Sequence, residues 1–294
     1  MKKIGFIGVG IMGKSMVKNL MKAGFELHIY ARTKSKVEDV ISEGAQFHES
    51  IKDCVQDCDA VITIVGFPQD VEEVYFDQGN ILDSAKEGAY LIDMTTTSPQ
   101  IAEKIYEEGT KRGFHVMDAP VTGGDTGAKA GTLSILVGGE KEDYEACMPL
   151  FEAMGTNINY QGKAGCGQHC KLANQIMIAG TLSGVCEALT YAKEQGLDPE
   201  VFMKSVATGA AGSKQLDTFG PKILKDDYAP GFFMKHFIKD MKLALIEANR
   251  KGLSLDVLSM VLANYEELEQ EGYGDLGTQA LMKFYDEEHR NMEE

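Results

Sequence analysis

The chain lacks tryptophan and is poor in basic residues. Its 294 residues include 29 lysines and arginines against 45 aspartates and glutamates, so its formal net charge at pH 7 is −16. A chain this acidic is repelled by polyanions, and we therefore expect neither nucleic acid nor an anionic membrane surface as a partner. Hydrophobic residues make up 44% of the sequence, which is enough to bury sizeable cores in one or two domains.

Long apolar runs are also missing. No unbroken run of 18 apolar residues occurs, so we expect no transmembrane span. A strand pattern begins within three residues of Met1, which leaves no room for a secretory signal. The six cysteines are scattered, and neither Cys54/Cys58 nor Cys166/Cys170 has convincing zinc-ligand spacing. Free thiols in a reducing cytoplasm and no metal are therefore expected, with structural zinc as the alternative.

The first 24 residues have the pattern of a strand, a glycine turn and a helix. Apolar residues 4–7 predict a buried strand, and helical periodicity follows the turn. In G-x-G-x-x-G spacing, the first glycine permits a tight turn, the second lets a pyrophosphate approach the backbone, and the third lets the helix pack closely on the strand. An ordinary turn is the alternative to a dinucleotide site. The predicted cofactor contacts are Gly8, Gly10, Ile11, Met12 and Gly13.

Strand and helix patterns alternate over the first half of the chain and change near residues 162–165. Strands separated by helices imply right-handed βαβ units and a mainly parallel sheet. After the change no strong strand pattern is found. We therefore predict an α/β Rossmann domain over residues 1–163 and an all-α domain over residues 164–294. The predicted strands are 4–7, 27–30, 60–65, 90–94, 115–119 and 133–137; the predicted helices are 34–44, 98–112, 167–195, 199–207, 213–224, 236–251 and 256–270.

The end of the second strand bears on the choice of dinucleotide. In NAD sites an Asp or Glu about 20 residues after the glycines binds the ribose 2′-hydroxyl. Here no acid is present at this strand end; Arg32 stands there instead, with Thr33 and Lys36 nearby. Because a guanidinium binds two phosphate oxygens at once, we predict that NADP is preferred over NAD. A solvated basic loop, or Arg32 stacked on the adenine, is the alternative.

Three later segments carry polar residues suited to chemistry. Residues 118–124 leave a strand and become a glycine turn, which can present successive N–H groups to a carboxylate. Lys171 and Asn174 open the long helix three residues apart, so both project from one face. Lys239 and Asp240 begin a later helical run. The alternatives are a plain turn, a solvated lysine, an asparagine that bridges helices, and a surface ion pair.

These segments resemble motifs of the β-hydroxyacid dehydrogenase family, which includes 3-hydroxyisobutyrate dehydrogenase, tartronate semialdehyde reductase and the glyoxylate/succinic semialdehyde reductases. The resemblance covers essentially the whole chain and keeps the family's order of motifs. They are G-x-G-x-M-G at residues 8–13, D-A-P-V-[ST]-G-G at 118–124, G-x-x-x-K-x-x-N at 167–174 and K-D-x-x-L-A at 239–244.

The resemblance implies roles for the matching substrate-site residues. Lys171 would be the general acid/base, and it would also contact the substrate. Thr122, Gly123 and Gly124 would hold the substrate carboxylate. Asn174 would orient the substrate hydroxyl and the lysine.

The resemblance also implies cofactor contacts outside the glycine turn. Lys239 would lie against the cofactor and help to lower the pKa of the catalytic lysine. Val65 and Thr96 would contact the nicotinamide side, although Thr95 or Thr97 could take the place of Thr96.

The function implied is interconversion of a small 3-hydroxy acid, or another short hydroxy acid, and its semialdehyde or oxo acid by hydride transfer, in a homodimer or homotetramer. An imine reductase-like enzyme and a non-catalytic cofactor-binding relative are alternatives. Both kinds of relative usually lack a lysine at the position that corresponds to Lys171. Another alternative, 6-phosphogluconate dehydrogenase, shares the first domain but has a much longer helical portion.

Overall fold

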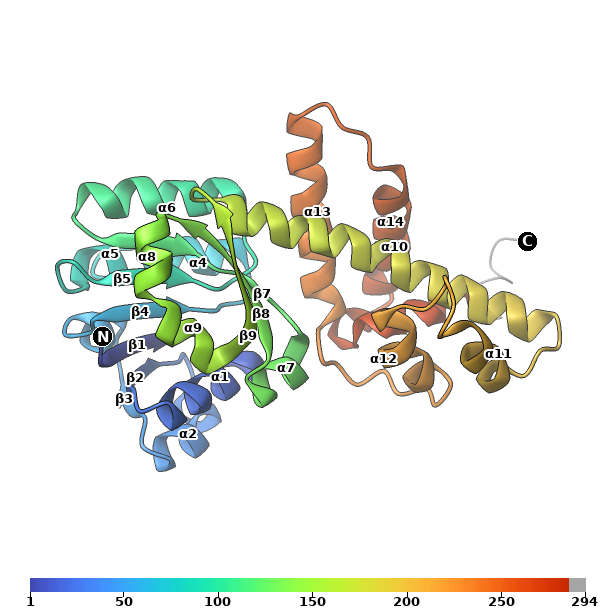
Figure 1. Cartoon of the computed structure of the whole chain (residues 1–294), viewed down its shortest axis with the longest axis horizontal. Helices are drawn as coiled ribbons and strands as arrows, with labels where there is room; N and C mark the ends of the chain where they lie inside the picture. Colours follow the sequence, from blue (N-terminus) through green and yellow to red (C-terminus); the bar gives the residue numbers. More distant parts are fainter. Residues whose placement is uncertain (286–294) are drawn as a thin grey trace. The chain divides into compact units, whose positions relative to one another are not determined.

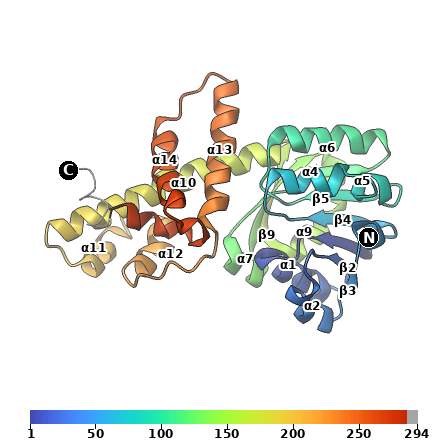
Figure 2. The same ribbon diagram turned by 180° about the vertical axis from the view of Figure 1, so that it is seen from behind.

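The computed structural model describes residues 1–285 (Figures 1 and 2). The chain divides into two compact units, the first of which is Met1–Lys171 and the second of which begins at Leu172. The division falls within one helix, α10 (Cys166–Glu194). The predicted domain boundary after residue 163 lies just before this helix and stays a prediction.

The first unit is built on a nine-stranded sheet in the order β3-β2-β1-β4-β5-β6-β8-β7, with β9 paired to β8. Strands β1 to β6 run parallel to one another, whereas β6 pairs antiparallel with β8. The order of the six parallel strands is that of a doubly wound dinucleotide-binding sheet. The prediction of a mainly parallel Rossmann sheet is therefore confirmed. The strands are β1 (Lys3–Ile7), β2 (Glu26–Tyr30), β3 (Gln46–His48), β4 (Ala60–Thr63), β5 (Tyr90–Asp93), β6 (His115–Asp118), β7 (Val121–Thr122), β8 (Leu133–Gly139) and β9 (Gly155–Gly162).

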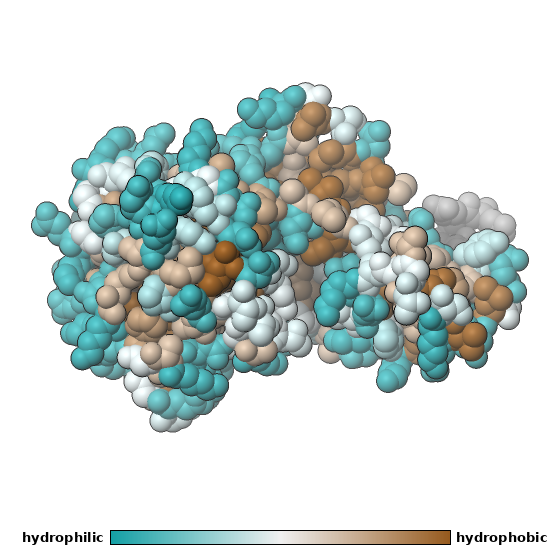
Figure 3. Space-filling model, in the orientation of Figure 1, coloured by the Kyte–Doolittle hydropathy of each residue, from teal (hydrophilic) through white to brown (hydrophobic). Residues whose placement is uncertain are grey.

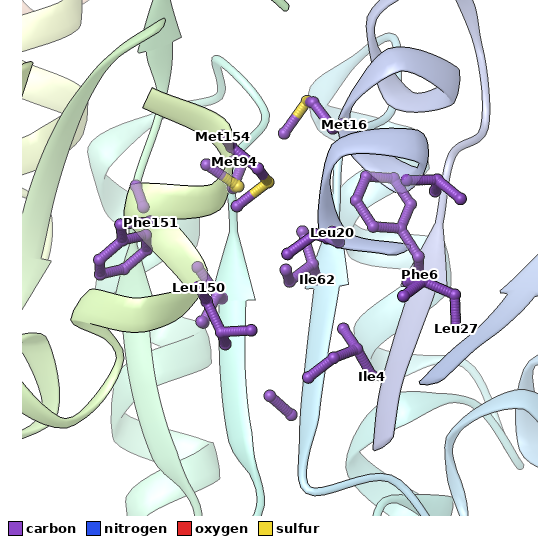
Figure 4. Close-up of a cluster of buried hydrophobic side chains, with 14 of the residues drawn as sticks. Ile4, Phe6, Met16, Leu20, Leu27, Ile62, Met94, Leu150, Phe151 and Met154 are labelled. Carbon is purple, nitrogen blue, oxygen red and sulfur yellow. The ribbon is translucent and has the colours of Figure 1, made fainter. Parts of the chain in front are cut away.

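Apolar cores cover both faces of this sheet. Successive strand residues point to opposite faces, so in β1 Phe6 enters one core and Ile7 the other. Figure 4 shows the first of these cores, where side chains of α1 and α9 pack over the strands. The helices of this unit are α1 (Ile11–Lys22), η1 (Lys34–Lys36), α2 (Glu38–Ser42), α3 (Ile51–Val55), α4 (Pro68–Phe76), α5 (Ile81–Ser84), α6 (Pro99–Lys111), α7 (Gly124–Ala130), α8 (Lys141–Ala146) and α9 (Met148–Met154).

Several short strands and helices of the first unit were not predicted, and two of the differences have a clear physical reason. The helix predicted over residues 34–44 is in fact two short pieces, η1 and α2, separated at Val37. Strand β9 was not predicted because its sequence, GTNINYQG, is polar, and most of its residues are partly or fully exposed. A strand at the end of a sheet pairs through its backbone alone, so its side chains need not be apolar.

The second unit is helical, as predicted. Its core lies between α10, α13 and α14, where Phe237 and Tyr265 pack edge to face with ring centroids 5.4 Å apart. The Tyr265 hydroxyl donates a hydrogen bond to the carbonyl of Thr278 at 2.7 Å, which ties the end of the described chain to this core. Besides α10, the helices are α11 (Pro199–Val206), α12 (Lys214–Ile223), α13 (Met234–Arg250), α14 (Asp256–Gln270), η2 (Tyr273–Asp275) and η3 (Thr278–Tyr285).

Helix α10 is strongly apolar even though it contains no unbroken run of 18 apolar residues. An 18-residue window within it has a mean hydropathy of 1.2, which makes it long and apolar enough to cross a membrane by length and composition. The core helix of a globular unit meets the same criterion, and 44% of this window is buried. Hydrophobic side chains also gather on the surface over α10, α13 and α14 (Figure 3). The exposed ones in this region are Met177, Ile246, Leu253, Val257 and Met260.

Candidate active site

Two glycines of the β1–α1 turn are required by the fold, and one is open to a ligand. Gly8 has φ +97°, and a Cβ there would lie 2.0 Å from the carbonyl oxygen of Ile64. A Cβ on Gly13 would lie 2.2 Å from the carbonyl oxygen of Gly8. A Cβ on Gly10, in contrast, would meet no atom of residues 1–285 within 4 Å. This open approach to the Gly10 backbone fits a bound pyrophosphate.

Helix α1 begins directly after this open position. Its N-cap residue, Gly10, has no side chain to occupy the first N–H groups of the helix, and the first turn holds no acidic residue. These N–H groups and the helix dipole suit a phosphate. The other two predicted contacts form the first helical turn: Ile11 is 49% exposed, whereas Met12 packs against the core.

The predicted adenosine-side residues follow β2. Arg32 lies two residues beyond the end of this strand and its side chain is 74% exposed. Thr33 is the N-cap of η1, which contains the exposed Lys36. The Arg32 guanidinium lies 3.3 Å from Asp70 Oδ1, a carboxylate supplied by the first turn of α4. Sequence reasoning missed Asp70 because the search for an acid was confined to the end of the second strand.

The predicted nicotinamide-side residues follow β4 and β5. The backbone N–H of Val65 donates to the Thr95 hydroxyl at 3.0 Å, so the two segments are joined directly. Thr95 and Thr97 are buried, whereas Thr96 is partly exposed. Thr96 is therefore the best placed of the three threonines to contact a ligand.

A buried carboxyl group lies beneath these segments. Asp93 Oδ1 accepts hydrogen bonds from the Thr63 hydroxyl at 2.7 Å and from the Thr95 N–H at 3.1 Å. Its Oδ2 has no hydrogen-bond partner among residues 1–285. Burial raises the pKa of this carboxyl to about 6, although the hydrogen bonds favour its ionised form.

The Asp93→Asn variant is expected to gain stability relative to the wild type as the pH rises. The folded chain holds a proton on Asp93 up to pH 6, whereas the unfolded chain releases it near pH 4, so this group lowers wild-type stability across that interval. An amide oxygen can accept the same two hydrogen bonds without titrating. The free energy of unfolding of the variant, minus that of the wild type, should rise by at most about 3 kcal/mol between pH 4 and 7.

Urea unfolding at several pH values measures this difference. Asp59→Asn is the control with a pKa shift of opposite sign, because hydrogen bonds from Lys86 and from the Lys2 N–H hold the pKa of Asp59 well below its usual range. Because this shift acts only below about pH 4, where the unfolded chain takes up a proton before the folded chain does, the stability of Asp59→Asn relative to the wild type should stay nearly constant from pH 4 to 7. Stability curves of Asp93→Asn and wild type that run parallel from pH 4 to 7 would contradict the prediction.

The start of α10 is fixed by two residues whose roles were not predicted. Asp118 accepts hydrogen bonds from the N–H groups of Gly165 and Gln168, each at 2.8 Å, and so caps the helix. The Gln168 amide donates to the carbonyl of Thr95 at 2.7 Å and accepts from the N–H of Thr97 at 3.0 Å. Both side chains are buried. Helix α10 is therefore locked to the segment that carries Thr96.

Lys171 lies one turn beyond this anchor. It is 7% exposed, so it is not the solvated surface lysine considered as the alternative. Gly167, in the same motif, is needed for packing because a Cβ there would lie 2.4 Å from the carbonyl oxygen of Leu136. The first turns of α10 thus hold a lysine at a defined buried position.

In the second unit Asn174 and Lys239 belong to one polar network. The Asn174 amide donates to Gln175 at 2.8 Å, and the Gln175 amide donates to Asp240 Oδ2 at 2.7 Å. The Lys239 ammonium lies 2.9 Å from Asp240 Oδ1. The two side chains of this ion pair are 12% and 1% exposed, so it is not a surface pair. Paired partners of this kind are what a buried carboxylate requires.

The predicted carboxylate-binding turn lies between β7 and α7. Thr122 ends β7 and is partly exposed. Gly123 and Gly124 have φ values of +129° and +64°, which favour glycine at both positions. Such a turn can direct backbone N–H groups toward one anion.

Within the first unit, the glycine turn and the segments carrying Arg32, Val65 and Thr96 all follow the carboxyl ends of parallel strands. These ends share one edge of the sheet, where α/β sheets bind ligands. The residue types fit a dinucleotide: N–H groups for the pyrophosphate and basic side chains for the adenosine end. Among residues 1–285, no group of three His, Cys, Asp or Glu side chains is placed to hold a metal ion.

Comparison with known proteins identifies both parts of the chain. Residues 3–162 match the NAD-binding domain of 6-phosphogluconate dehydrogenase, and residues 165–285 match the NAD-binding domain of NADP-dependent 3-hydroxyisobutyrate dehydrogenase. The uncharacterized oxidoreductase YkwC of Bacillus subtilis is 50% identical over 97% of this chain and 99% of its own length. The probable 3-hydroxyisobutyrate dehydrogenase-like 1 of Arabidopsis thaliana is 45% identical over 95% of this chain and 84% of its own length.

A solved structure agrees with these matches. The 3-hydroxyisobutyrate dehydrogenase of Mycobacterium tuberculosis, solved with L-serine, superposes with a TM-score of 0.88 and 26% identity over 96% of this chain and 98% of that one. The chain therefore belongs to the β-hydroxyacid dehydrogenase family and is an NAD(P)-binding oxidoreductase.

Proposed function

We propose that the protein interconverts a small 3-hydroxy acid, or another short hydroxy acid, and its semialdehyde or oxo acid, with Lys171 as the general acid/base. The observation that carries this proposal is the burial of Lys171, 7% exposed, directly after the helix start that Asp118 and Gln168 anchor. Lysine is rarely buried without a function or a partner. A fixed lysine side chain can donate a proton to one substrate oxygen as the ammonium and can accept a proton from it as the neutral amine.

In the reductive direction Lys171 donates a proton to the oxygen that becomes the hydroxyl; in the oxidative direction it accepts that proton. The nicotinamide, when bound, supplies or accepts the hydride. Thr122 and the N–H groups of Gly123 and Gly124 hold the substrate carboxylate, and Asn174 orients the substrate hydroxyl. Asn174 suits this role because Gln175 holds its amide.

The cofactor contacts proposed are the turn from Gly8 to Gly13, the segment after β2, Val65, Thr96 and Lys239. Arg32, Thr33 and Lys36 would favour NADP over NAD, because they concentrate donors and positive charge where a 2′-phosphate is bound in this fold. Lys239 would help to hold the cofactor and to lower the pKa of Lys171.

We also propose a cytoplasmic homodimer or homotetramer acting on small molecules. All six cysteines are free thiols, which suits a reducing compartment. The exposed apolar side chains over α10, α13 and α14 suit an interface between copies. Light scattering of the purified chain tests this, since a monomeric mass would contradict it.

A substrate panel tests the proposed reaction. Glyoxylate, succinic semialdehyde, tartronate semialdehyde and methylmalonate semialdehyde are each offered with NADPH and with NADH, and 3-hydroxyisobutyrate is offered in reverse with NADP. We expect at least one of them to be turned over, with a higher kcat/KM for NADPH than for NADH. Absence of turnover with every compound would refute the reaction, and a higher kcat/KM for NADH would refute the cofactor preference.

A further inference from the structure

The ion pair between Arg32 and Asp70 connects segments on the two sides of the glycine turn. Ile7, the last residue before that turn, pairs with Tyr30 of β2 on one side and Thr63 of β4 on the other. Strands on either side of a common neighbour are about 10 Å apart, a distance that a long arginine side chain can help to span. The pair therefore lies at the sheet edge where the proposed dinucleotide binds.

The two partners differ in how firmly they are held. Asp70 is 18% exposed, and its Oδ2 accepts a hydrogen bond from the Phe67 N–H at 2.9 Å in the first turn of α4. A carboxylate there is also favoured by the helix dipole. The Arg32 side chain is 74% exposed. Asp70 is thus the fixed partner, and Arg32 is the partner free to turn toward a ligand.

We propose that Asp70 is a specificity-determining residue, which lowers the preference for NADPH over NADH through its ion pair with Arg32. This inference rests on the cofactor use proposed above. A 2′-phosphate must share Arg32 with Asp70 or displace it, and it meets repulsion from a carboxylate that α4 holds in place. A ribose 2′-hydroxyl carries no charge and can donate a hydrogen bond to the same carboxylate. The acid absent from the end of β2 is in this way supplied by α4.

The Asp70→Asn variant tests the negative charge of Asp70 without changing the start of α4. The asparagine oxygen can still accept the Phe67 N–H, so the start of α4 is kept while the negative charge is removed. Glu73→Gln is the matched control, because it removes one negative charge from an exposed position of the same helix. Dissociation constants for NADPH and NADH are measured by nicotinamide fluorescence on the full chain, which requires neither a substrate nor turnover.

We expect Asp70→Asn to strengthen NADPH binding relative to NADH binding by about two- to fivefold, and Glu73→Gln to leave this ratio unchanged. In an Arg32→Ala background the effect of Asp70→Asn should shrink, since the ion pair is already lost. An unchanged ratio in Asp70→Asn, or an equal shift in Glu73→Gln, would overturn the inference.

The same titration separates this inference from the proposed function. Wild-type chain that binds NADPH no tighter than NADH, together with a shifted ratio in Asp70→Asn, would support the role of Asp70 and refute the NADP preference. Wild-type chain that prefers NADPH, together with an unshifted Asp70→Asn ratio, would support the preference and refute the role of Asp70. Thermal unfolding of each variant confirms that the compared chains are folded.

Discussion

Replacing Lys171 with alanine is expected to lower kcat by about 10²- to 10⁴-fold, the range over which a positioned general acid/base accelerates a reaction. Binding of NADPH should change little, because the proposed pyrophosphate and adenosine contacts lie on other elements. The measurement pairs steady-state kinetics on the best substrate of the panel with a fluorescence titration of the cofactor.

Three comparisons make the Lys171 result specific. Lys163→Ala removes an exposed lysine shortly before the same helix and should leave kcat within about twofold, as expected for a surface change. Lys171→Arg keeps the positive charge but not a titratable one, so it should be nearly as inactive as the alanine variant. An added primary amine should restore part of the activity of Lys171→Ala. Turnover of Lys171→Ala above a tenth of the wild-type value would rule out the proposed acid/base role.

The fold was largely predictable because its signals are local. A buried parallel strand is an apolar run, and a helix repeats its apolar positions every three to four residues. The strands β1, β2, β4, β5 and β6 and the long helix α10 all carry such patterns. Strand β9 does not, because a strand that pairs at the side of a sheet is stabilised by backbone hydrogen bonds that leave no mark on its side chains.

The candidate residues were predictable from motifs, but the contacts that support them were not. Gln168 bonds Thr97 across 71 positions of sequence, and Gln175 bonds Asp240 across 65. A glutamine in a helix carries no local sign of such a partner. Only the folded chain distinguishes these buried amides from solvated ones.

The role of Asp70 also could not be predicted from the local sequence. This residue lies 38 positions after Arg32, beyond the interval in which a ribose-binding acid is ordinarily sought. Asp70 lies near the predicted phosphate site because β2 and β4 flank β1 in the sheet, so the segments that follow these two strands are neighbours. The residue type at the end of one strand therefore does not alone determine the charge of that site, because the neighbouring βα segment places a carboxylate beside it.

Replacement by alanine should have different effects at two glycines of the β1–α1 turn. It should destabilise the fold at Gly8 and weaken cofactor binding at Gly10. Gly8→Ala should lower the free energy of unfolding by more than about 4 kcal/mol, because the new Cβ meets the Ile64 carbonyl oxygen at 2.0 Å and φ is +97°. Gly10→Ala should cost no more than about 1 kcal/mol, the usual range for an N-cap change. Its backbone is extended, and its Cβ would meet no described atom within 4 Å.

Gly10→Ala, which should hardly change stability, should have a large effect on cofactor binding. In folded Gly10→Ala the added methyl group occupies the approach proposed for the pyrophosphate. NADPH affinity should therefore fall by about 10- to 100-fold, which corresponds to the loss of about one hydrogen bond to a charged group. Gly184→Ala in α10 is the control, because its Cβ also meets no described atom within 4 Å and no cofactor contact is assigned to it. Urea unfolding and fluorescence titration of the three variants measure both quantities. If Gly10→Ala bound NADPH as tightly as Gly184→Ala, the pyrophosphate could not lie over Gly10, and the assignment of this turn as the phosphate site would be wrong.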